Sequence, residues 1–329
     1  MTPPGLPAPP CPGLLAAWRF RPGQPPENLD EPAAAAAIAA GVAGLWLHFD
    51  LVDQRARATI ATLPLPAAAR TALLEPDDST HLDVLGGALC GTIPDFHFES
   101  DRREAAELAL LHLALTPGLL VTARRHPLSV VGAVARRPEG THPGAALGAI
   151  LRGLAEAAGQ AIQGMSDRLA RLEDALLHTP DLATERVALA AMRRAALRLE
   201  RNFGATAEAL GELDQDPPEG MEHEVFAPVF REARRFAALS RSLGTVKERG
   251  RIAQDELAGL AAEKTNQRLF VLSVISAVML PPALIAGIFG MNVGNLPGVE
   301  APWGFALAML LIIGSIGGVL AALRWFRMM

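Results

Sequence analysis

The residues with the clearest chemical role lie between two long uncharged stretches near the C-terminus. Gly290, Met291 and Asn292 close the first stretch and open a short loop. The side-chain carbonyl of Asn292 and the neighbouring backbone carbonyls are neutral oxygen donors, which suit a hydrated or partly hydrated divalent cation. Gly290 could also cap the end of a helix, and the two roles are compatible. These three residues are therefore a plausible site for a cation.

Counting back from Asn292 at helical spacing gives one face shared by small, polar and leucine side chains. Leucines on such a face could narrow a passage and close it by dewetting, or they could face lipid or a second helix instead. Pro281 and Pro282 remove backbone hydrogen bonds from the same segment, so a kink or free carbonyls are expected there. The expected lining residues are Asn266, Leu269, Leu272, Ser273, Ser276, Leu280, Ala283 and Gly287.

Two further groups of ligand-type residues lie earlier in the chain. In the first group, Asp95, His97, Glu99 and Asp101 alternate along a short segment. A strand would place all four on one face as a reasonable zinc set, although a charged edge strand is the simpler interpretation. The second is an acidic stretch at residues 211–224. It is either the solvated tip of a helical hairpin or a diffuse attractor for divalent cations.

The two uncharged stretches have the length of membrane spans. Residues 269–289 and 303–323 are each 21 residues long. A hydrocarbon layer of about 30 Å needs about 20 helical residues, so both stretches are expected to cross a membrane. Lys and Arg flank the pair but are absent from residues 290–302. This asymmetry predicts an extracytoplasmic loop, cytoplasmic termini and, for residues 324–329, a cytosolic tail at the inner membrane.

Composition narrows the class of protein further. Hydrophobic residues make up 50% of the chain and charged residues 20%, and the net charge is −5. These values exclude a disordered chain and argue against general electrostatic binding to nucleic acid. The sequence has no P-loop, nucleophile elbow or HExxH pattern. We therefore expect neither enzymatic activity nor a resident cofactor.

The residues before the spans divide into three expected regions. Residues 1–125 predict a cytosolic α/β domain with a mixed sheet, because short apolar runs alternate with Pro-, Gly- and Ala-rich pieces. Residues 126–226 predict a helical hairpin region, since two apolar stripes at helical spacing flank a short break. A helix continuous from about Ala227 to Phe289 would form a stalk over residues 227–268. The expected strands are 14–20, 44–51, 81–89, 108–115 and 119–123.

The segment around this candidate cation site resembles a known family. Residues 280–292, LPPALIAGIFGMN, are similar to the pore helix and Gly-Met-Asn motif of the CorA superfamily of divalent-cation transporters. The loop that follows, VGNLPG at residues 293–298, lacks the acid common in magnesium-type members and resembles the ZntB branch, which transports zinc. The end of the chain, RWFR at residues 324–327, is similar to the same branch, and Phe289 stands where the magnesium branch usually has Tyr.

The resemblance implies an architecture and several roles. It implies a funnel-shaped homopentamer in the lipid bilayer, with the first spans lining a pore and the second spans outside, where Gly314 and Gly318 permit close packing. Gly290, Met291 and Asn292 match the entry filter of the family, and Asn266 and Leu280 match its pore positions. Asp255 matches a regulatory cation-binding Asp, although a solvated helix acid is an equal alternative.

The resemblance also implies a cargo and leaves alternatives. Zinc uptake is the leading interpretation, with proton coupling suggested for the ZntB branch and Mg²⁺, Co²⁺, Ni²⁺ or Cd²⁺ as other candidate ions. The first alternative is a CorA-type magnesium, cobalt or nickel channel. The second is a membrane-anchored scaffold or sensor in which the two spans only tether the cytosolic region.

Overall fold

The computed structural model describes residues 11–75, 79–97, 107–178, 183–217, 223–291 and 302–325. The chain divides into two compact units, Met1–Ala253 and Gln254–Met329. Each unit is described by itself below, and one long helix contributes residues to both.

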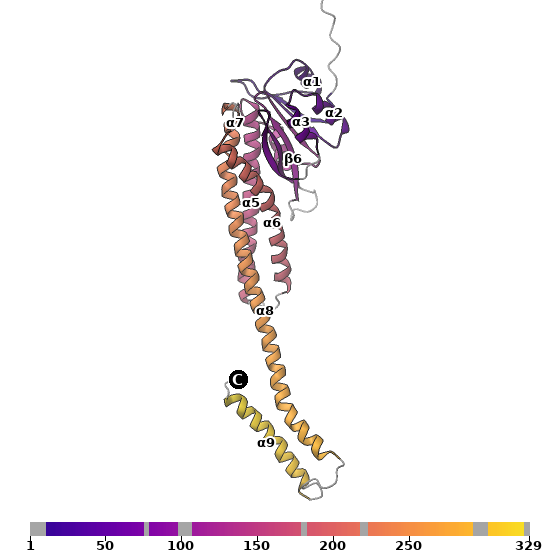
Figure 1. The fold of residues 1–329 in the computed structure, drawn as a ribbon, viewed down its shortest axis with the longest axis vertical. Helices are drawn as coiled ribbons and strands as arrows, with labels where there is room; N and C mark the ends of the chain where they lie inside the picture. The colour runs from indigo at the N-terminus through magenta and orange to yellow at the C-terminus, as the bar shows by residue number, and fades with distance from the viewer. Residues whose placement is uncertain are drawn as a thin grey trace, which may run out of the picture. The chain divides into compact units, whose positions relative to one another are not determined.

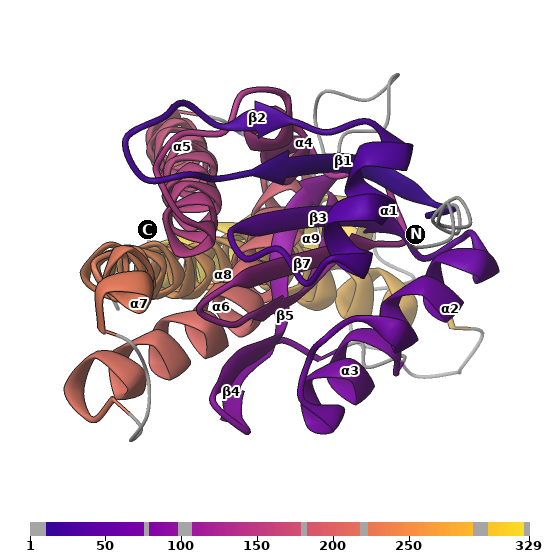
Figure 2. The same cartoon turned by 90° about the horizontal axis from the view of Figure 1, so that it is seen from above.

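The first unit is built on a seven-stranded mixed sheet in the order β2-β1-β3-β7-β6-β5-β4 (Figure 2). β3 and β7 run parallel and the other neighbouring strands run antiparallel. The mixed sheet was expected from the sequence and is confirmed. The strands are β1 (Leu14–Arg19), β2 (Glu27–Asn28), β3 (Leu45–Asp50), β4 (His81–Leu85), β5 (Ala88–His97), β6 (Glu107–Leu115) and β7 (Leu119–Arg124).

The run predicted as one strand over 81–89 is wrong, because it contains a hairpin. Gly86 and Gly87 lie between β4 and β5 with φ angles of 62° and 78°. Positive φ at both central residues is the requirement of a two-residue turn of type I′, which glycine meets without steric cost. The two glycines therefore reverse the chain where apolar continuity alone suggested one strand.

Helices cover both faces of the sheet in separate cores (Figure 2). One core packs α1 (Glu31–Ala39), α2 (Gln54–Thr62) and α3 (Ala67–Leu74) against inward residues such as Leu47, Phe49 and Val121. The other packs α4 (Ser129–Arg136), α5 (Pro143–His178) and α6 (Ala183–Gln215) against Trp46, Leu113 and Leu120. Because strand side chains alternate between faces, one sheet can support both cores.

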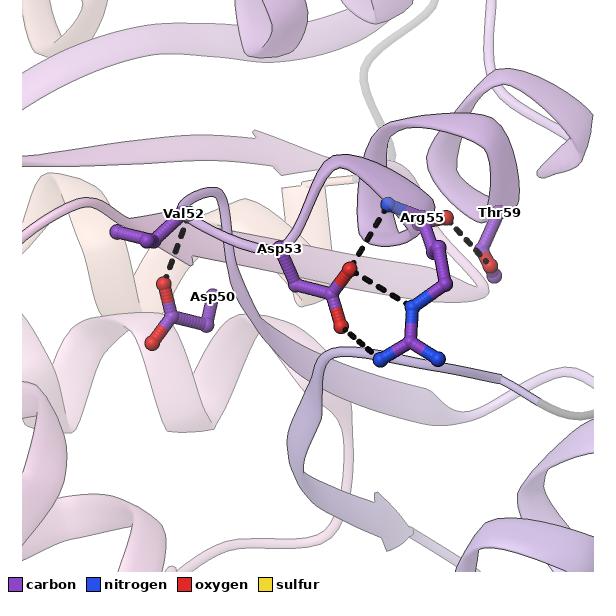
Figure 3. A network of polar contacts seen from close by, with 5 residues as sticks. All are labelled: Asp50, Val52, Asp53, Arg55 and Thr59. Atoms are coloured by element: carbon purple, nitrogen blue, oxygen red, sulfur yellow. Dashed lines mark hydrogen bonds and ion pairs between the residues drawn. The ribbon is translucent and has the colours of Figure 1, made fainter.

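A local polar network begins α2 (Figure 3). Asp53 accepts a hydrogen bond from the Arg55 backbone N–H at 2.9 Å, and its carboxylate pairs with the Arg55 guanidinium at 2.8 Å. These bonds lower the pKa of the Asp53 carboxyl below its ordinary value. Asp50 accepts a bond from the Val52 N–H at 2.9 Å. Each bond spans two residues, so the network caps a helix and a turn.

The helix expected to be continuous from Ala227 is interrupted about one turn after that residue. The structure has α7 (His223–Phe230) and then α8 (Ala233–Phe289), with a turn at Arg231 and Glu232. The Glu232 N–H bonds to the Val229 carbonyl three residues back, which tightens the end of α7. The Glu232 carboxylate is buried and lies 3.4 Å from Arg152 and 3.2 Å from Arg235. The pair with Arg152 joins the turn to α5, and the pair with Arg235 joins it to the first turn of α8.

The second unit consists of the later part of α8 and of α9 (Gly304–Trp325) (Figure 1). Both helices are long and apolar enough to cross a membrane, and the most apolar window of each is entirely unburied. The chain thus combines an α/β N-terminal domain, a long helix and two apolar C-terminal helices, as the sequence predicted.

Candidate cation pathway

The expected lining residues all lie on α8, and most of their side chains are exposed. Leu269, Leu272 and Leu280 expose 55%, 60% and 69% of their surface. Leucines this exposed over the length of a membrane span are not explained by the packing of a water-soluble domain. They require lipid, other helices or further copies of the chain around α8. Asn266, Ala283 and Gly287 are exposed on the same helix.

The two serines of the candidate lining donate to their own helix. Ser273 Oγ donates to the Leu269 carbonyl at 2.8 Å, and Ser276 Oγ donates to the Leu272 carbonyl at 2.9 Å. A serine hydroxyl that donates its single proton keeps two acceptor lone pairs on the oxygen. Both serines are therefore satisfied within apolar surroundings and can still accept from water around a passing cation.

α8 continues through Pro281 and Pro282 to Phe289. Neither proline has an N–H, so the carbonyls of Ala277 and Val278, four residues back, lack their usual helical donors. The predicted loss of helical hydrogen bonds follows from the residue types, and the helix is not broken there. Carbonyl oxygens without a donor are the neutral ligands that cation pathways use.

The filter motif begins where α8 ends. The Gly290 N–H donates to the Ala286 carbonyl at 2.9 Å, and the Met291 N–H lies 3.4 Å from the Ile288 carbonyl. A Cβ at residue 290 would lie 3.1 Å from the Ala286 oxygen, and the φ angle of Gly290 is not in the left-handed region. Gly290 therefore avoids a close contact between a Cβ atom and the Ala286 carbonyl, and it does not end the helix in the left-handed conformation. Asn292 lies outside the described residues.

Asp95, one of the four candidate metal ligands, accepts hydrogen bonds from backbone N–H groups. Its Oδ1 accepts from the N–H groups of Phe96 and Val130 at 2.6 and 3.2 Å, and its Oδ2 accepts from Val131 at 2.9 Å. Burial raises the pKa of this carboxyl, while these hydrogen bonds oppose the rise. Asp95 therefore caps the first turn of α4 from β5, as an acid favoured at a helix N-terminus does.

The segment around Asp95 fits neither sequence interpretation fully. β5 is not the edge strand, because β4 lies beyond it, although β4 pairs only with residues 88–92. His97 ends β5 and has a second histidine, His126, beside it. Glu99 and Asp101 lie outside the described residues. Within the described part of the chain, no group of three or more His, Cys, Asp or Glu is placed to hold a metal.

A buried polar cluster in the sheet is structural. Trp46 Nε1 donates to Thr122 Oγ1 at 2.8 Å, and His48 Nδ1 lies 2.9 Å from the same hydroxyl. Burial and the nearby Arg124 lower the pKa of His48 to about 3. The imidazole is therefore neutral near pH 7, and the cluster joins the parallel strands β3 and β7.

Asp255 lies on α8 at the start of the second unit. The acidic stretch is only partly described: Glu212 and Asp214 lie in the last turns of α6, and residues 218–222 are outside the described part. The expectations for Asp255 and for this stretch stay predictions.

An α/β domain joined by a long helix to two exposed apolar helices defines an integral membrane protein. The comparisons identify its family. Residues 43–327 match the sequence profile described as CorA-like Mg2+ transporter protein. The chain belongs to this family, which is one of divalent-cation transporters and not of enzymes.

Curated relatives match most of this chain. The zinc transport protein ZntB of Pectobacterium atrosepticum is 26% identical over 279 residues, covering 83% of this chain and 84% of that protein. ZntB of Yersinia enterocolitica is 26% identical over 295 residues, covering 86% and 87%.

Solved structures share the fold. Full-length CmaX has a TM-score of 0.76 at 21% identity, covering 96% of this chain and 98% of CmaX. The CorA magnesium transporter of Methanocaldococcus jannaschii has a TM-score of 0.73 at 18% identity, covering 94% and 96%.

Proposed function

We propose that this chain transports divalent metal cations, zinc first among them, through a pore formed by several copies of the first span. The observation that carries the proposal is the pair of unburied apolar helices joined at Gly290-Met291-Asn292 in a CorA-like chain. The printed function of the ZntB relatives supports zinc as the cargo.

Two spans from one chain cannot enclose a pore, so the proposal requires a homo-oligomer. We place the α8 spans around the pore and the α9 spans outside, and we take five copies from the resemblance to the CorA superfamily. In α9, a Cβ on Gly314 or Gly318 would meet nothing within 4 Å, which leaves this face open for another helix. The membrane would be the inner membrane, with both termini cytoplasmic.

The pathway would recognise the ion through water and neutral oxygen. Asn292, with the backbone near Gly290 and Met291, would hold a hydrated cation at the extracytoplasmic entrance. Ser276 and Ser273 would accept hydrogen bonds from its water, and Leu280, Leu272 and Leu269 would form apolar constrictions that close by dewetting. Ala283 and Gly287 would leave width near the entrance, and Asn266 would provide a polar exit. Asp255 would sense cations from the stalk.

The driving force would be electrical. A cytosol-negative potential of about 100 mV contributes about 4.6 kcal/mol to the entry of a divalent ion. Both spans lack Asp, Glu and His. Proton coupling, which the resemblance suggests, would therefore need a carrier outside the spans.

Metal flux into proteoliposomes tests the proposal directly. We expect zinc entry that rises with an inside-negative potential and falls at least tenfold in Asn292→Ala. Asn295→Ala, in the same loop, is the matched control and should keep most of the flux. Repeating the measurement with and without a pH gradient tests coupling. Equal flux in Asn292→Ala and the original chain would remove the filter role.

A second candidate function is a magnesium, cobalt or nickel channel. The family description and the likeness to the Methanocaldococcus jannaschii fold favour it. Magnesium flux without zinc flux would establish this alternative. A chain that passes no divalent cation would support the scaffold or sensor interpretation.

A further inference from the structure

The two prolines of the first span free two backbone carbonyls that lie on different sides of α8. Pro281 takes the helical donor from the Ala277 carbonyl, and Pro282 takes it from the Val278 carbonyl. At about 100° per residue, Ala277 is about 60° from Leu280 and belongs to the candidate lining side. Val278 is about 200° from Leu280, on the opposite side. The Val278 carbonyl therefore does not face the candidate pathway.

A carbonyl without a donor is costly at the position of Val278. This residue is about 14 Å of helix beyond Leu269, near the middle of a hydrocarbon layer of about 30 Å. Lipid tails supply no donor, so proline is tolerated in a span where a neighbouring helix, a Ser or Thr side chain or a water supplies the missing bond. On the side away from the pathway, that donor must come from another helix.

Ser315 of α9 is a donor at the matching depth. It is the only Ser, Thr, Asn or Gln within residues 303–323, and it lies about 12 Å from the cytoplasmic end of that span. Gly314 precedes it and Gly318 follows one turn later, and a Cβ on either glycine would meet nothing within 4 Å. Small residues let two helices approach closely enough for a hydrogen bond between them.

The present bond of Ser315 is redundant for its acceptor. Ser315 Oγ donates to the Ile312 carbonyl at 2.8 Å. The same carbonyl lies four residues before Ile316, whose N–H is its helical donor. If the hydroxyl turned to Val278, the Ile312 carbonyl would keep a donor and the Val278 carbonyl would gain one. No polar group would be left without a partner.

We propose that the Ser315 hydroxyl donates to the Val278 carbonyl of an α8 span, in its own chain or in a neighbouring copy. The inference rests on the proposed arrangement, in which α8 spans surround the pore and α9 spans lie outside. Ser315 is then a positioning residue. It fixes α9 to the side of α8 that Pro282 leaves short of a donor, and so keeps the lining side of α8 turned towards the pore.

Disulfide formation in membranes tests the proximity on the full-length chain. Val278→Cys with Ser315→Cys should cross-link at least tenfold faster than Leu280→Cys with Ser315→Cys, because Leu280 lies at similar depth on the opposite side. Cys11 and Cys90 are buried, and peptide mass spectrometry identifies the joined peptides. A monomer-sized product shows packing within one chain, and a dimer-sized product shows packing between copies. Cross-linking from residue 280 that is as fast as from residue 278 would overturn the proposal.

A double-mutant cycle tests the bond itself. Ser315→Ala should lower the temperature at which half of the protein leaves its size-exclusion peak by about 2–4 °C, and Ser315→Thr, which keeps a hydroxyl, should lose less. Pro282→Ala returns a donor to the Val278 carbonyl, so Ser315→Ala should cost less than about 1 °C in that background. Pro281→Ala is the matched control, because it returns a donor to Ala277 alone and should leave the cost unchanged. Equal costs in all three backgrounds would contradict the bond.

Neither measurement depends on transport. A chain that passes no divalent cation but shows the cross-link and the coupling would keep the role of Ser315 and lose the proposed function. A chain that transports zinc but shows neither would keep the proposed function and lose the role of Ser315.

Discussion

The two units of this chain differ in how their exposed apolar side chains are distributed. In the first unit, most apolar side chains fill the two cores beside the sheet, and exposed ones such as Val187 are scattered. In the second unit, exposed apolar residues follow one another along α8 and α9, as Leu310, Leu311 and Ile313 do. Val187 and Leu310 are exposed to nearly the same extent, 69% and 68%. In water, a single apolar side chain this exposed is tolerated on a protein surface. Around a membrane span, the same exposure would give a favourable contact with lipid.

The polar groups differ in a parallel way. In the first unit, the buried carboxylate of Asp95 is satisfied by a distant segment, through the N–H groups of Val130 and Val131. In the spans, Ser273 and Ser276 bond within their own helix. Hydrocarbon offers no partner for a polar group, so a membrane span must satisfy its polar groups internally. A fold in water can bring such partners from far along the chain.

The largest expected effect comes from placing a charge at each of two equally exposed positions. Leu310→Lys puts a cation near the middle of α9 and should cost about 2.5–3.5 kcal/mol for insertion, so the chain should largely fail to reach the membrane. Val187→Lys should change stability by less than about 0.5 kcal/mol. Membrane fractionation and detergent-extracted yield measure both variants. Equal yields of the two variants would contradict a lipid environment for α9.

The next effect is a loss of stability in acid that belongs to the first unit. The folded pKa of His48 is about 3, below its ordinary value of 6.5, so folding excludes a proton that the unfolded chain binds. Its stabilising contribution is complete above pH 6.5 and declines as the pH falls towards 3, approaching about 5 kcal/mol in total. Urea unfolding followed by tryptophan fluorescence at several pH values should show this slope. His48→Gln should flatten it, and an unchanged slope would contradict a buried neutral histidine.

A smaller effect is expected from the buried cap of α4. Asp95→Ala leaves the buried N–H groups of Phe96 and Val131 without their acceptor, so it should destabilise the first unit by about 2–4 kcal/mol. The urea midpoint measures the change. Asp95→Asn keeps an acceptor oxygen and should lose less. If Asp95→Ala had no effect, the carboxylate would not be capping α4 in solution.

The smallest effect is expected from the exposed cap of α2. Asp53 bonds to Arg55 through atoms that water can replace (Figure 3). Asp53→Ala should therefore destabilise the first unit clearly less than Asp95→Ala does in the same urea titration. A loss as large as that of Asp95→Ala would show that burial does not set the difference between the two caps.

Local sequence patterns predicted much of the fold but failed at chain reversals. The apolar stripe between Leu151 and Leu172 predicted α5, because helical periodicity is a local property. The hairpin at Gly86 and Gly87 was missed, since the apolar run crosses it. The turn at Glu232 was missed because ion pairs to Arg152 and Arg235 accompany it, and no local spacing reveals Arg152 as a partner.

The candidate sites show the same division. The exposure of Leu269, Leu272 and Leu280 agrees with a span that the sequence could place, because lack of charge over a membrane length is visible residue by residue. Asp95 accepts hydrogen bonds from the first turn of α4, a partner that only the tertiary fold brings to it, and its candidate role as a ligand stays a prediction. His126 was missed for the same reason.

The sequence by itself determined which two segments are long and apolar enough to cross a membrane, and that Gly290, Met291 and Asn292 follow the first of them. Apolar length and the positions of Lys and Arg carry that information because a bilayer acts on each segment separately. Only the tertiary structure decided which polar groups of the first unit are partners. In the folded unit, Asp95 accepts a hydrogen bond from α4, and the neutral His48 lies beside Thr122. The rings of His97 and His126 are also neighbours. Those pairings join residues far apart in the chain, so they exist only once the sheet has formed.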